Sequence, residues 1–294
     1  MLLLTGATGL VGSALLRRLV GEGTQVRCLV RDPRRLGAQR VRVQIALGDL
    51  TDPPSFRNAM RGVHTVVHLA ASIRDQPRGS IEELNGIATW RMVQAAQRAG
   101  VERFVFFSVL GASVHHRARF FRAKALAEQA VGEADLRSTV FAPSIVYAPG
   151  DPRLTLLERI ALLPVMPVSG RGRATYQPIW AEDVADCVIA ALHAPGGERD
   201  TTERFELAGP QTLSNDEIVR LVLRSQNRGR PLLHIPTPIV SRGLRLLEAT
   251  MGQRAFATWD EAELMEVPML SGRGMADAEG LGITPQAMAA VLGG

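Results

Sequence analysis

The first half of the chain alternates short apolar runs with longer segments in which apolar residues recur every three or four positions. The runs are four to six residues long and rich in valine, leucine and phenylalanine. Predicted strands of this kind cover 2–4, 26–30, 41–46, 65–69, 104–107 and 138–141, and predicted helices cover 10–20, a segment through Trp90 and Ala96, and one through Ala125 and Val131. This order is typical of βαβ units, so we expect an α/β fold with a doubly wound parallel sheet.

Beyond Gly150 the segments become shorter and richer in proline. Pro143 has no N–H to donate and is expected to end the preceding strand. Residues 174–180 and 205–207 are strand-like and are candidates to complete the sheet, while helices are expected at 181–193 and 214–224, where Ser214 and Glu217 form a capping box. We therefore expect a large domain over 1–150 and a smaller, partly helical C-terminal substrate region over 151–294 that closes the cleft.

Composition narrows the classes of protein to consider. The net charge of +5 comes from arginines spread along the chain, without the block of like charges that marks a nucleic-acid-binding arm. No stretch reaches the roughly 18–20 apolar residues of a membrane span, and the N-terminus lacks a signal peptide pattern. Cys28 and Cys187 lie in apolar runs without metal-ligand spacing, so buried thiols, no metal and a reducing cytoplasm are expected.

A glycine-rich turn follows the first strand directly and opens the first helix. It reads Gly6-Ala7-Thr8-Gly9-Leu10-Val11-Gly12. Gly6 permits the tight turn, Gly9 lets the backbone approach a pyrophosphate, and Gly12 allows close packing of helix on strand. Because the helix N-terminus then faces the phosphates, the sequence predicts a Rossmann dinucleotide site.

The end of the second strand bears on the choice of cofactor. An acid there binds the ribose 2′-hydroxyl of NAD, whereas a basic residue accommodates the extra phosphate of NADP. The strand ends in Arg31, followed by Asp32, with Arg34 and Arg35 close behind. NADP(H) is favoured, and Asp32 keeps NAD(H) open.

Two later segments also reach the carboxyl edge of the predicted sheet. Asp49 and Leu50 follow the third strand, and residues 69–71 follow the fourth. Because open α/β sheets bind ligands at this edge, both segments are expected at the cofactor. His68 follows two valines inside the strand, so a core histidine is favoured over a catalytic one.

Lys124 is the only lysine among the 34 basic Lys and Arg residues of the chain. Arginine is a planar fork that stays charged, whereas lysine is a compact donor whose pKa shifts readily when it is buried. A position where arginine has not been used is a candidate chemical site, with chance as the alternative.

Taken in order, these motifs resemble the short-chain dehydrogenase/reductase superfamily in its extended or atypical branch. The resemblance rests on TGATGLVG, GDL, VVHLAA, Asn85 in LNGIAT, VERFVFFS, the Lys124 helix, APSIVYAPGD and IWAEDVADCVIAAL, and spans about residues 1–225. It implies that Asp49 and Leu50 flank the adenine, that 69–71 line the ribose and pyrophosphate path, and that 143–145 meet the nicotinamide carboxamide. With the glycine-rich turn, the expected cofactor contacts are Gly6, Thr8, Gly9, Leu10, Val11, Gly12, Arg31, Asp49, Leu50, Leu69, Ala70, Ala71, Ser108, Lys124, Pro143, Ser144 and Ile145.

The chain departs from the family at the residues of its chemistry. Lys124 matches the lysine of the YxxxK motif, which holds the nicotinamide ribose, but Phe120 stands where the tyrosine acid belongs. Leu110 occupies the position of the usual serine or threonine. This pattern resembles the NAD(P)-binding accessory subunit of mitochondrial complex I and the NmrA-like sensors, in which the dinucleotide serves mainly as a structural or sensing ligand.

An enzymatic alternative stays open, in which a hydride passes to a bulky apolar or quinone-like substrate. His116 and Tyr147 are the candidate acids, although an exposed basic loop and a packed turn residue are the favoured interpretations of the two.

The C-terminal part carries fewer signals. A predicted helix over 239–251 and the residues just after it carry Arg242, Arg245 and Arg254, which suit a protein partner or a membrane surface, and ordinary packing is favoured. We thus expect a cytoplasmic protein, with peripheral membrane contact left open.

Overall fold

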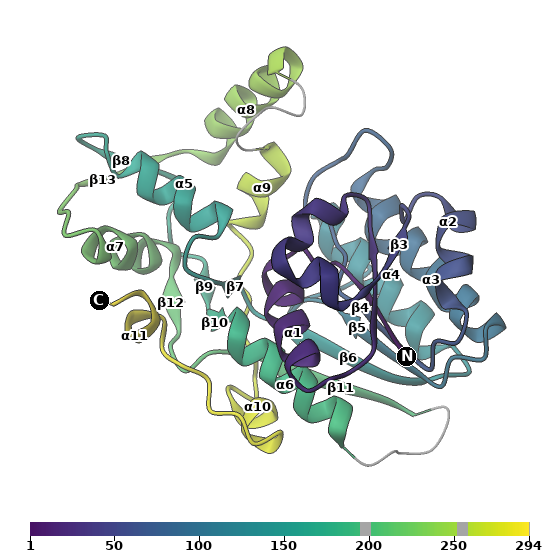
Figure 1. Cartoon of the computed structure of the whole chain (residues 1–294). Helices are drawn as coiled ribbons and strands as arrows, with labels where there is room; N and C mark the ends of the chain where they lie inside the picture. Colours follow the sequence, from purple (N-terminus) through teal and green to yellow (C-terminus); the bar gives the residue numbers. More distant parts are fainter. Residues whose placement is uncertain (195–200, 252–257, 294) are drawn as a thin grey trace.

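A seven-stranded parallel sheet forms the body of the protein in the computed structural model, which describes residues 1–194, 201–251 and 258–293 (Figure 1). Its strand order is β11-β6-β5-β4-β1-β2-β3, and every neighbouring pair is parallel. The strands are β1 (Leu2–Thr5), β2 (Val26–Val30), β3 (Gln44–Leu47), β4 (Thr65–His68), β5 (Arg103–Phe107), β6 (Arg137–Pro143) and β11 (Thr202–Leu207). The order reverses between β1 and β4, which confirms the doubly wound fold.

Helices cover both faces of this sheet. Helices α1 (Leu10–Gly21) and α6 (Ala181–His193) pack on one face, and α2 (Pro53–Arg57), α3 (Ala88–Arg98) and α4 (Arg119–Gly132) pack on the other. Successive residues of β1 serve the two faces in turn, since Leu2 and Leu4 contact the α1 side and Leu3 the α3 side. Burial on both faces explains why these strands are continuous apolar runs.

The C-terminal region consists of helices and two-stranded ribbons beside the sheet. Its elements are β7 (Val146–Tyr147), α5 (Pro152–Ile160), β8 (Met166–Ser169), β9 (Thr175–Tyr176), β10 (Ile179–Trp180), β12 (Leu213–Ser214), α7 (Asn215–Ser225), β13 (Leu232–Ile235), α8 (Thr237–Met251), α9 (Trp259–Leu264), α10 (Ala276–Gly280) and α11 (Met288–Leu292). Three short helical turns complete the rest of the chain, η1 (Pro33–Arg42), η2 (Asn58–Met60) and η3 (Glu83–Ile87). None of the helices in the described ranges is long and apolar enough to cross a membrane.

Only one of the two later strand-like segments joins the large sheet. Strand β11, which includes 205–207, pairs with β6, but the sheet extension considered at 174–180 is wrong. That segment divides into β9 and β10, which pair with β12 and β7. Pro178 lies between the two pieces and has no N–H for a continuous ladder.

The third strand begins later than its apolar pattern predicts. Residues up to Arg42 form the turns of η1, which are joined at Gly37 with a φ of 59°. Val41 is consequently 83% exposed, and the strand starts at Gln44. Strand β3 lies at the edge of the sheet, where apolar residues can be exposed both in the strand and just before it. Hydrophobicity alone therefore placed the start of the strand too early.

Several local expectations are confirmed. Pro143 is the last residue of β6, and Ser214 and Glu217 form the expected capping box at the start of α7. Cys28 and Cys187 are buried free thiols.

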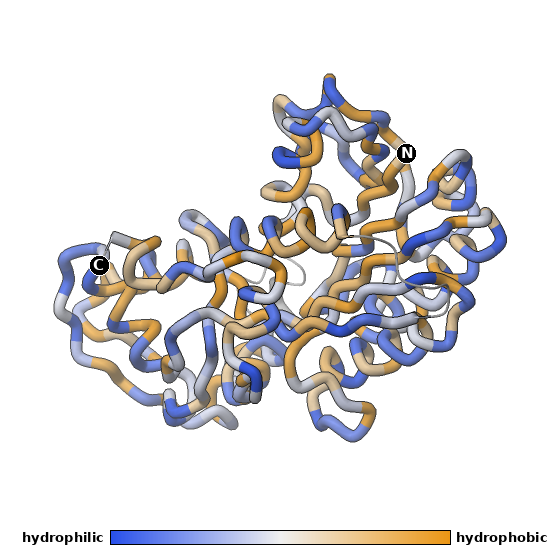
Figure 2. Tube along the Cα trace, turned by 90° about the horizontal axis from the view of Figure 1, so that it is seen from below, coloured by the Kyte–Doolittle hydropathy of each residue, from blue (hydrophilic) through white to orange (hydrophobic). Residues whose placement is uncertain are grey.

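Hydrophobic residues gather along the central strands, and hydrophilic stretches lie on outer turns (Figure 2). A further apolar cluster joins the ends of β5 and β6 to the C-terminal region, through residues such as Leu110, Phe121, Tyr147, Tyr176 and Met269. The C-terminal region is therefore packed against the carboxyl edge of the sheet.

The turn from β1 into α1 leaves no room for a side chain at Gly12. A Cβ there would lie 2.0 Å from the carbonyl oxygen of Gly6. We expect Gly12→Ala to lower the free energy of unfolding by about 3 kcal/mol, because a backbone must shift to relieve the overlap. Gly21→Ala is the matched control, since a Cβ there meets nothing within 4 Å, and it should leave stability unchanged or slightly raised. Urea denaturation of both variants checks this, and equal stabilities would contradict it.

Candidate dinucleotide-binding site

A cleft of about 530 Å³ opens at the carboxyl ends of β1, β2, β3 and β4. Its size suits a small-molecule site, and its position is where doubly wound sheets bind ligands. The residues around it come from five segments of the chain: Thr5, Gly6, Ala7, Thr8, Gly9, Leu29, Val30, Arg31, Asp32, Arg35, Gly48, Asp49, Leu50, Leu69, Ala70, Ala71, Ser72, Gln76 and Leu84.

The glycine-rich turn forms the floor of this cleft. Gly6 has a φ of 73°, and a Cβ there would lie 2.7 Å from the backbone nitrogen of Ala70. The N–H of Gly9 donates to the carbonyl of Gly6 at 2.9 Å, and Gly9 caps α1 without a side-chain hydrogen bond. The free N–H groups and positive end of α1 are suited to phosphate, so this turn fits a dinucleotide.

Both charges at the end of β2 border the cleft. Arg31 and Arg35 line it together with Asp32, and all three are exposed. The Asp32 carboxylate accepts a hydrogen bond from the backbone N–H of Arg34 at 3.0 Å, as the N-cap of η1. One of its oxygens is thereby engaged, whereas no ion pair is found for Arg31 or Arg35 among the described residues.

The segments that follow β3 and β4 border the cleft on the two sides of the glycine-rich turn. The Asp49 carboxylate accepts from the backbone and the hydroxyl of Thr51, both at 3.1 Å. Ser72, Gln76 and Leu84 also line the cleft, although the sequence did not single them out. The position of all three after β4 could have indicated them. Ser72 and Gln76, however, lie in a loop without periodicity or a glycine pattern, and Leu84 lies in the η3 turn that follows.

His68 is the last residue of β4 and is a core residue, as expected. It is fully buried, and its ring nitrogens lie 2.7 Å from the Thr5 hydroxyl and 3.1 Å from the Thr89 hydroxyl. Burial, and secondarily the charge of Lys124, lowers the pKa of His68 to about 3. The ring is therefore neutral at physiological pH and joins β1 to β4 and α3.

Lys124 lies inside the protein and is not among the residues that line the cleft. It is 2% exposed, and its Nζ donates to the carbonyl of Phe107 at 2.5 Å. Nζ also lies 4.8 Å from the Phe106 ring centre and 5.9 Å from that of Phe120. Burial lowers the pKa of Lys124 to about 7, partly offset by the charge of Glu128.

The expected cofactor contacts fall into two groups. The cleft brings together Gly6, Thr8, Gly9, Arg31, Asp49, Leu50, Leu69, Ala70 and Ala71. Eight others lie outside its lining: Leu10, Val11, Gly12, Ser108, Lys124, Pro143, Ser144 and Ile145. Among these, the Ser144 hydroxyl bonds Met269 and Gln177 in the C-terminal region, and the buried Ser108 hydroxyl has no hydrogen-bond partner among the described residues.

Neither candidate acid borders the cleft. The His116 ring lies 4.5 Å from that of Phe121, its Nδ1 accepts from the Ala118 N–H at 3.0 Å, and burial lowers its pKa. Tyr147 is buried, and desolvation, followed by the charge of Asp183, raises its pKa. Its hydroxyl has no hydrogen-bond partner within the described ranges.

The rest of the chain bears on proton donors, on metal ligands and on the C-terminal arginines. The Tyr176 hydroxyl donates to the Met265 carbonyl at 2.5 Å. The described residues contain no group of three His, Cys, Asp or Glu side chains that could hold a metal ion. Arg254, which follows the predicted helix over 239–251, lies outside the described residues.

Comparison with known proteins agrees with this site. The family described as NAD(P)H-binding matches residues 6–195. The mitochondrial NADH dehydrogenase (ubiquinone) 1 alpha subcomplex subunit 9 of Arabidopsis thaliana is 29% identical over 245 residues, which are 80% of this chain and 60% of that protein. Sterol demethylase protein B of Methylococcus capsulatus is 31% identical over 280 residues, 86% of this chain and 83% of that protein. This chain thus spans less than two thirds of the plant subunit.

A solved nucleoside-diphosphate-sugar epimerase of Staphylococcus aureus shares the fold, with a TM-score of 0.76 at 19% identity over 99% of each chain. The chain belongs to the NAD(P)H-binding family, within the atypical branch of the short-chain dehydrogenase/reductase superfamily.

The burial of Lys124 makes stability depend on pH. Its pKa falls from 10.5 to about 7 on folding, so between these values the unfolded chain binds a proton that the folded chain does not. Stability therefore rises with pH across this window, by at most about 1.4 kcal/mol per pH unit. We expect Lys124→Met to remove this rise, measured as the difference in urea stability between wild type and variant at several values from pH 7 to 9. Parallel profiles would show that Lys124 titrates normally.

Proposed function

We propose that this protein binds NADP(H) in preference to NAD(H) and uses it as a structural or sensing ligand for a protein assembly. The observation that carries this proposal is the environment of Lys124. Its Nζ is held by the Phe107 carbonyl between two phenylalanine rings, and one of them belongs to Phe120, at the tyrosine position of the motif. A phenyl ring cannot transfer a proton, so the motif keeps its lysine but lacks its acid.

The distribution of tyrosine supports the same conclusion. The chain has two tyrosines. Tyr147 is buried with a raised pKa, and the Tyr176 hydroxyl is engaged by the Met265 carbonyl. Neither lines the cleft, so neither offers an obvious replacement for the missing phenol.

The charges beside β2 support NADP(H). Arg31 and Arg35 line the cleft, while one carboxylate oxygen of Asp32 accepts the hydrogen bond that caps η1. A guanidinium binds phosphate through charge-assisted hydrogen bonds, whereas NAD selection requires a free acid for the ribose.

The relatives support an assembly role. The Arabidopsis protein is by name a subunit of NADH dehydrogenase, and this chain matches 60% of its length. We further propose that residues 1–150, with β11, form the dinucleotide domain, and that 151–294 close the cleft. The buried free thiols support a reducing compartment such as the cytoplasm. The arginines of α8 are compatible with peripheral contact with a membrane.

A second candidate is an NADPH-dependent oxidoreductase acting on a bulky apolar substrate. The similarity to sterol demethylase protein B favours it. A bound nicotinamide would supply the hydride. The proton would come from water or from His116, whose pKa is lowered by burial.

Arg35 provides a test of cofactor choice. We expect Arg35→Ala to weaken NADPH binding roughly tenfold and to leave NADH binding nearly unchanged, because a charged hydrogen bond to phosphate contributes about 1.5–3 kcal/mol. Arg34→Ala is the control, since Arg34 is exposed on the same turn but does not line the cleft. Calorimetric titration measures both. Equal losses for both nucleotides, or tighter NADH than NADPH binding by the wild type, would contradict the preference.

Turnover distinguishes the two candidate functions. We expect saturating NADPH to remain unoxidised when the wild type is mixed with a panel of carbonyl and quinone acceptors, since no tyrosine acid stands beside Lys124. Rapid oxidation that is lost in His116→Ala and kept in Tyr147→Phe would instead support the oxidoreductase. Failure to bind either nucleotide would reject both candidates.

A further inference from the structure

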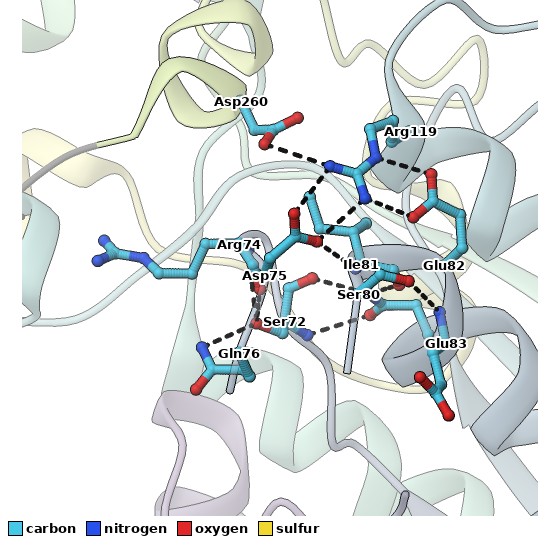
Figure 3. A network of polar contacts seen from close by, with 11 residues as sticks. Ser72, Arg74, Asp75, Gln76, Ser80, Ile81, Glu82, Glu83, Arg119 and Asp260 are labelled. Carbon is cyan, nitrogen blue, oxygen red and sulfur yellow. Dashed lines mark hydrogen bonds and ion pairs between the residues drawn. The ribbon is translucent and has the colours of Figure 1, made fainter. Parts of the chain in front are cut away.

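The loop after β4 has two sides with different surroundings. On one side, Ser72 and Gln76 line the dinucleotide cleft. On the other, Asp75 meets Arg119 at the start of α4 (Figure 3), and Arg74 donates to Glu261 of α9. One loop therefore contributes both to the cleft and to the contacts with α4 and α9.

Internal hydrogen bonds make the loop a single unit. The Asn85 side chain is buried, accepts from the Ser72 N–H at 3.1 Å, and donates to the carbonyls of Ser72 and Ile81, both at 2.7 Å. Gln76 and Gly79 exchange backbone hydrogen bonds at 2.9 and 3.1 Å. The Asp75 carboxylate also accepts from the Ile81 N–H at 2.7 Å. These bonds span the loop and connect its cleft side to its charged side.

Arg119 gathers three carboxylates from different parts of the chain. Its guanidinium donates to Glu82 at 2.7 and 2.6 Å and to Asp75 at 3.0 and 3.1 Å. Asp260 of α9 lies 3.7 Å from the same group. The hydrogen bonds from Arg119 lower the pKa of Glu82 to about 2. The Arg119 guanidinium offsets the repulsion among these three carboxylates, and one of the three belongs to α9.

Arg74 forms the second link to α9. Its Nε and Nη2 donate to Glu261 at 3.0 and 2.6 Å. The other oxygen of Glu261 accepts from the Thr258 N–H at 3.0 Å and completes the capping box of α9. Glu261 therefore joins the start of this helix directly to the cleft loop. From there, the Trp259 ring lies 4.5 Å from the guanidinium of Arg245 on α8, which stands at the outer edge of the molecule (Figure 1).

We propose that Arg74 and Arg119 are positioning residues that couple occupancy of the dinucleotide cleft to the docking of α9. This inference rests on the proposed binding function and supplies the output that a sensor needs. A dinucleotide that packs on the cleft side of the loop stabilises the arrangement in which both arginines meet α9. By linkage, the α9 contacts must strengthen dinucleotide binding by the same factor, although none of their residues on α9 lines the cleft.

The double variant Asp260→Asn, Glu261→Gln tests this coupling on the purified full-length chain. Glutamine at the third position of a helix still serves a capping box, so the start of α9 is kept while its charges are removed. Arg273→Gln is the control, because it breaks an ion pair at 3.2 Å with Asp277, an acid about as buried as Asp260 and Glu261, elsewhere in the C-terminal region. Two quantities are measured: NADPH affinity by calorimetry, and hydrogen exchange of the amides in 258–265 with and without saturating NADPH.

In the wild type and in Arg273→Gln, we expect NADPH to slow exchange in 258–265. In the double variant we expect this protection to disappear and the dissociation constant for NADPH to rise roughly five- to tenfold. A merely structural role for the two arginines would speed exchange with and without the nucleotide alike and leave the affinity unchanged. That outcome, or saturating NADPH without any protection of 258–265 in the wild type, would overturn the coupling while leaving dinucleotide binding intact. Absence of binding to the wild type would instead reject the proposed function.

Discussion

The contact between the Gly6 turn and its surroundings is the constraint on which the site depends. A Cβ at Gly6 would overlap the backbone of Ala70, and one at Gly12 would overlap Gly6 itself. The absence of two side chains therefore brings β1, α1 and the segment after β4 within backbone contact. That contact sets the floor of the cleft, presents the start of α1 to it, and fixes where the loop over 72–82 begins.

Patterns that repeat along the chain were readable from the sequence. Continuous apolar runs predicted β1, β2, β4, β5 and β6 because both faces of those strands are buried, and the glycine spacing predicted the turn. Features that depend on distant partners were not. The loop residues Ser72 and Gln76 carry no local signal, the strand pattern at 174–180 did not show which segments would pair with it, and the contacts of Arg119 join segments that the sequence leaves unrelated.

For Lys124, the sequence shows that the residue is unusual, and the structure shows the environment of its side chain. The sequence marked Lys124 as unusual because it is the only lysine of the chain, and the structure buries its ammonium beside the Phe106 ring and the Phe107 carbonyl. Burial at 2% exposure, however, could be known only from the structure. With desolvation dominating its pKa, the ammonium is stabilised chiefly by one carbonyl and the ring faces, so a nearby anion would favour its charged form.

Charge is distributed unevenly between the cleft and the far side of the loop after β4. The lining of the cleft holds two arginines, Arg31 and Arg35, and two aspartates, Asp32 and Asp49, whereas the far side of the loop holds four acids against Arg74 and Arg119. The far side is therefore the more repulsive of the two toward an anionic ligand. The acidic cluster on the far side does not bind an anionic ligand. Its ion pairs are partly exposed, so they contribute only while their geometry is kept, and that geometry depends on the loop that the ligand contacts. This separation allows one loop to bind on one side and report on the other.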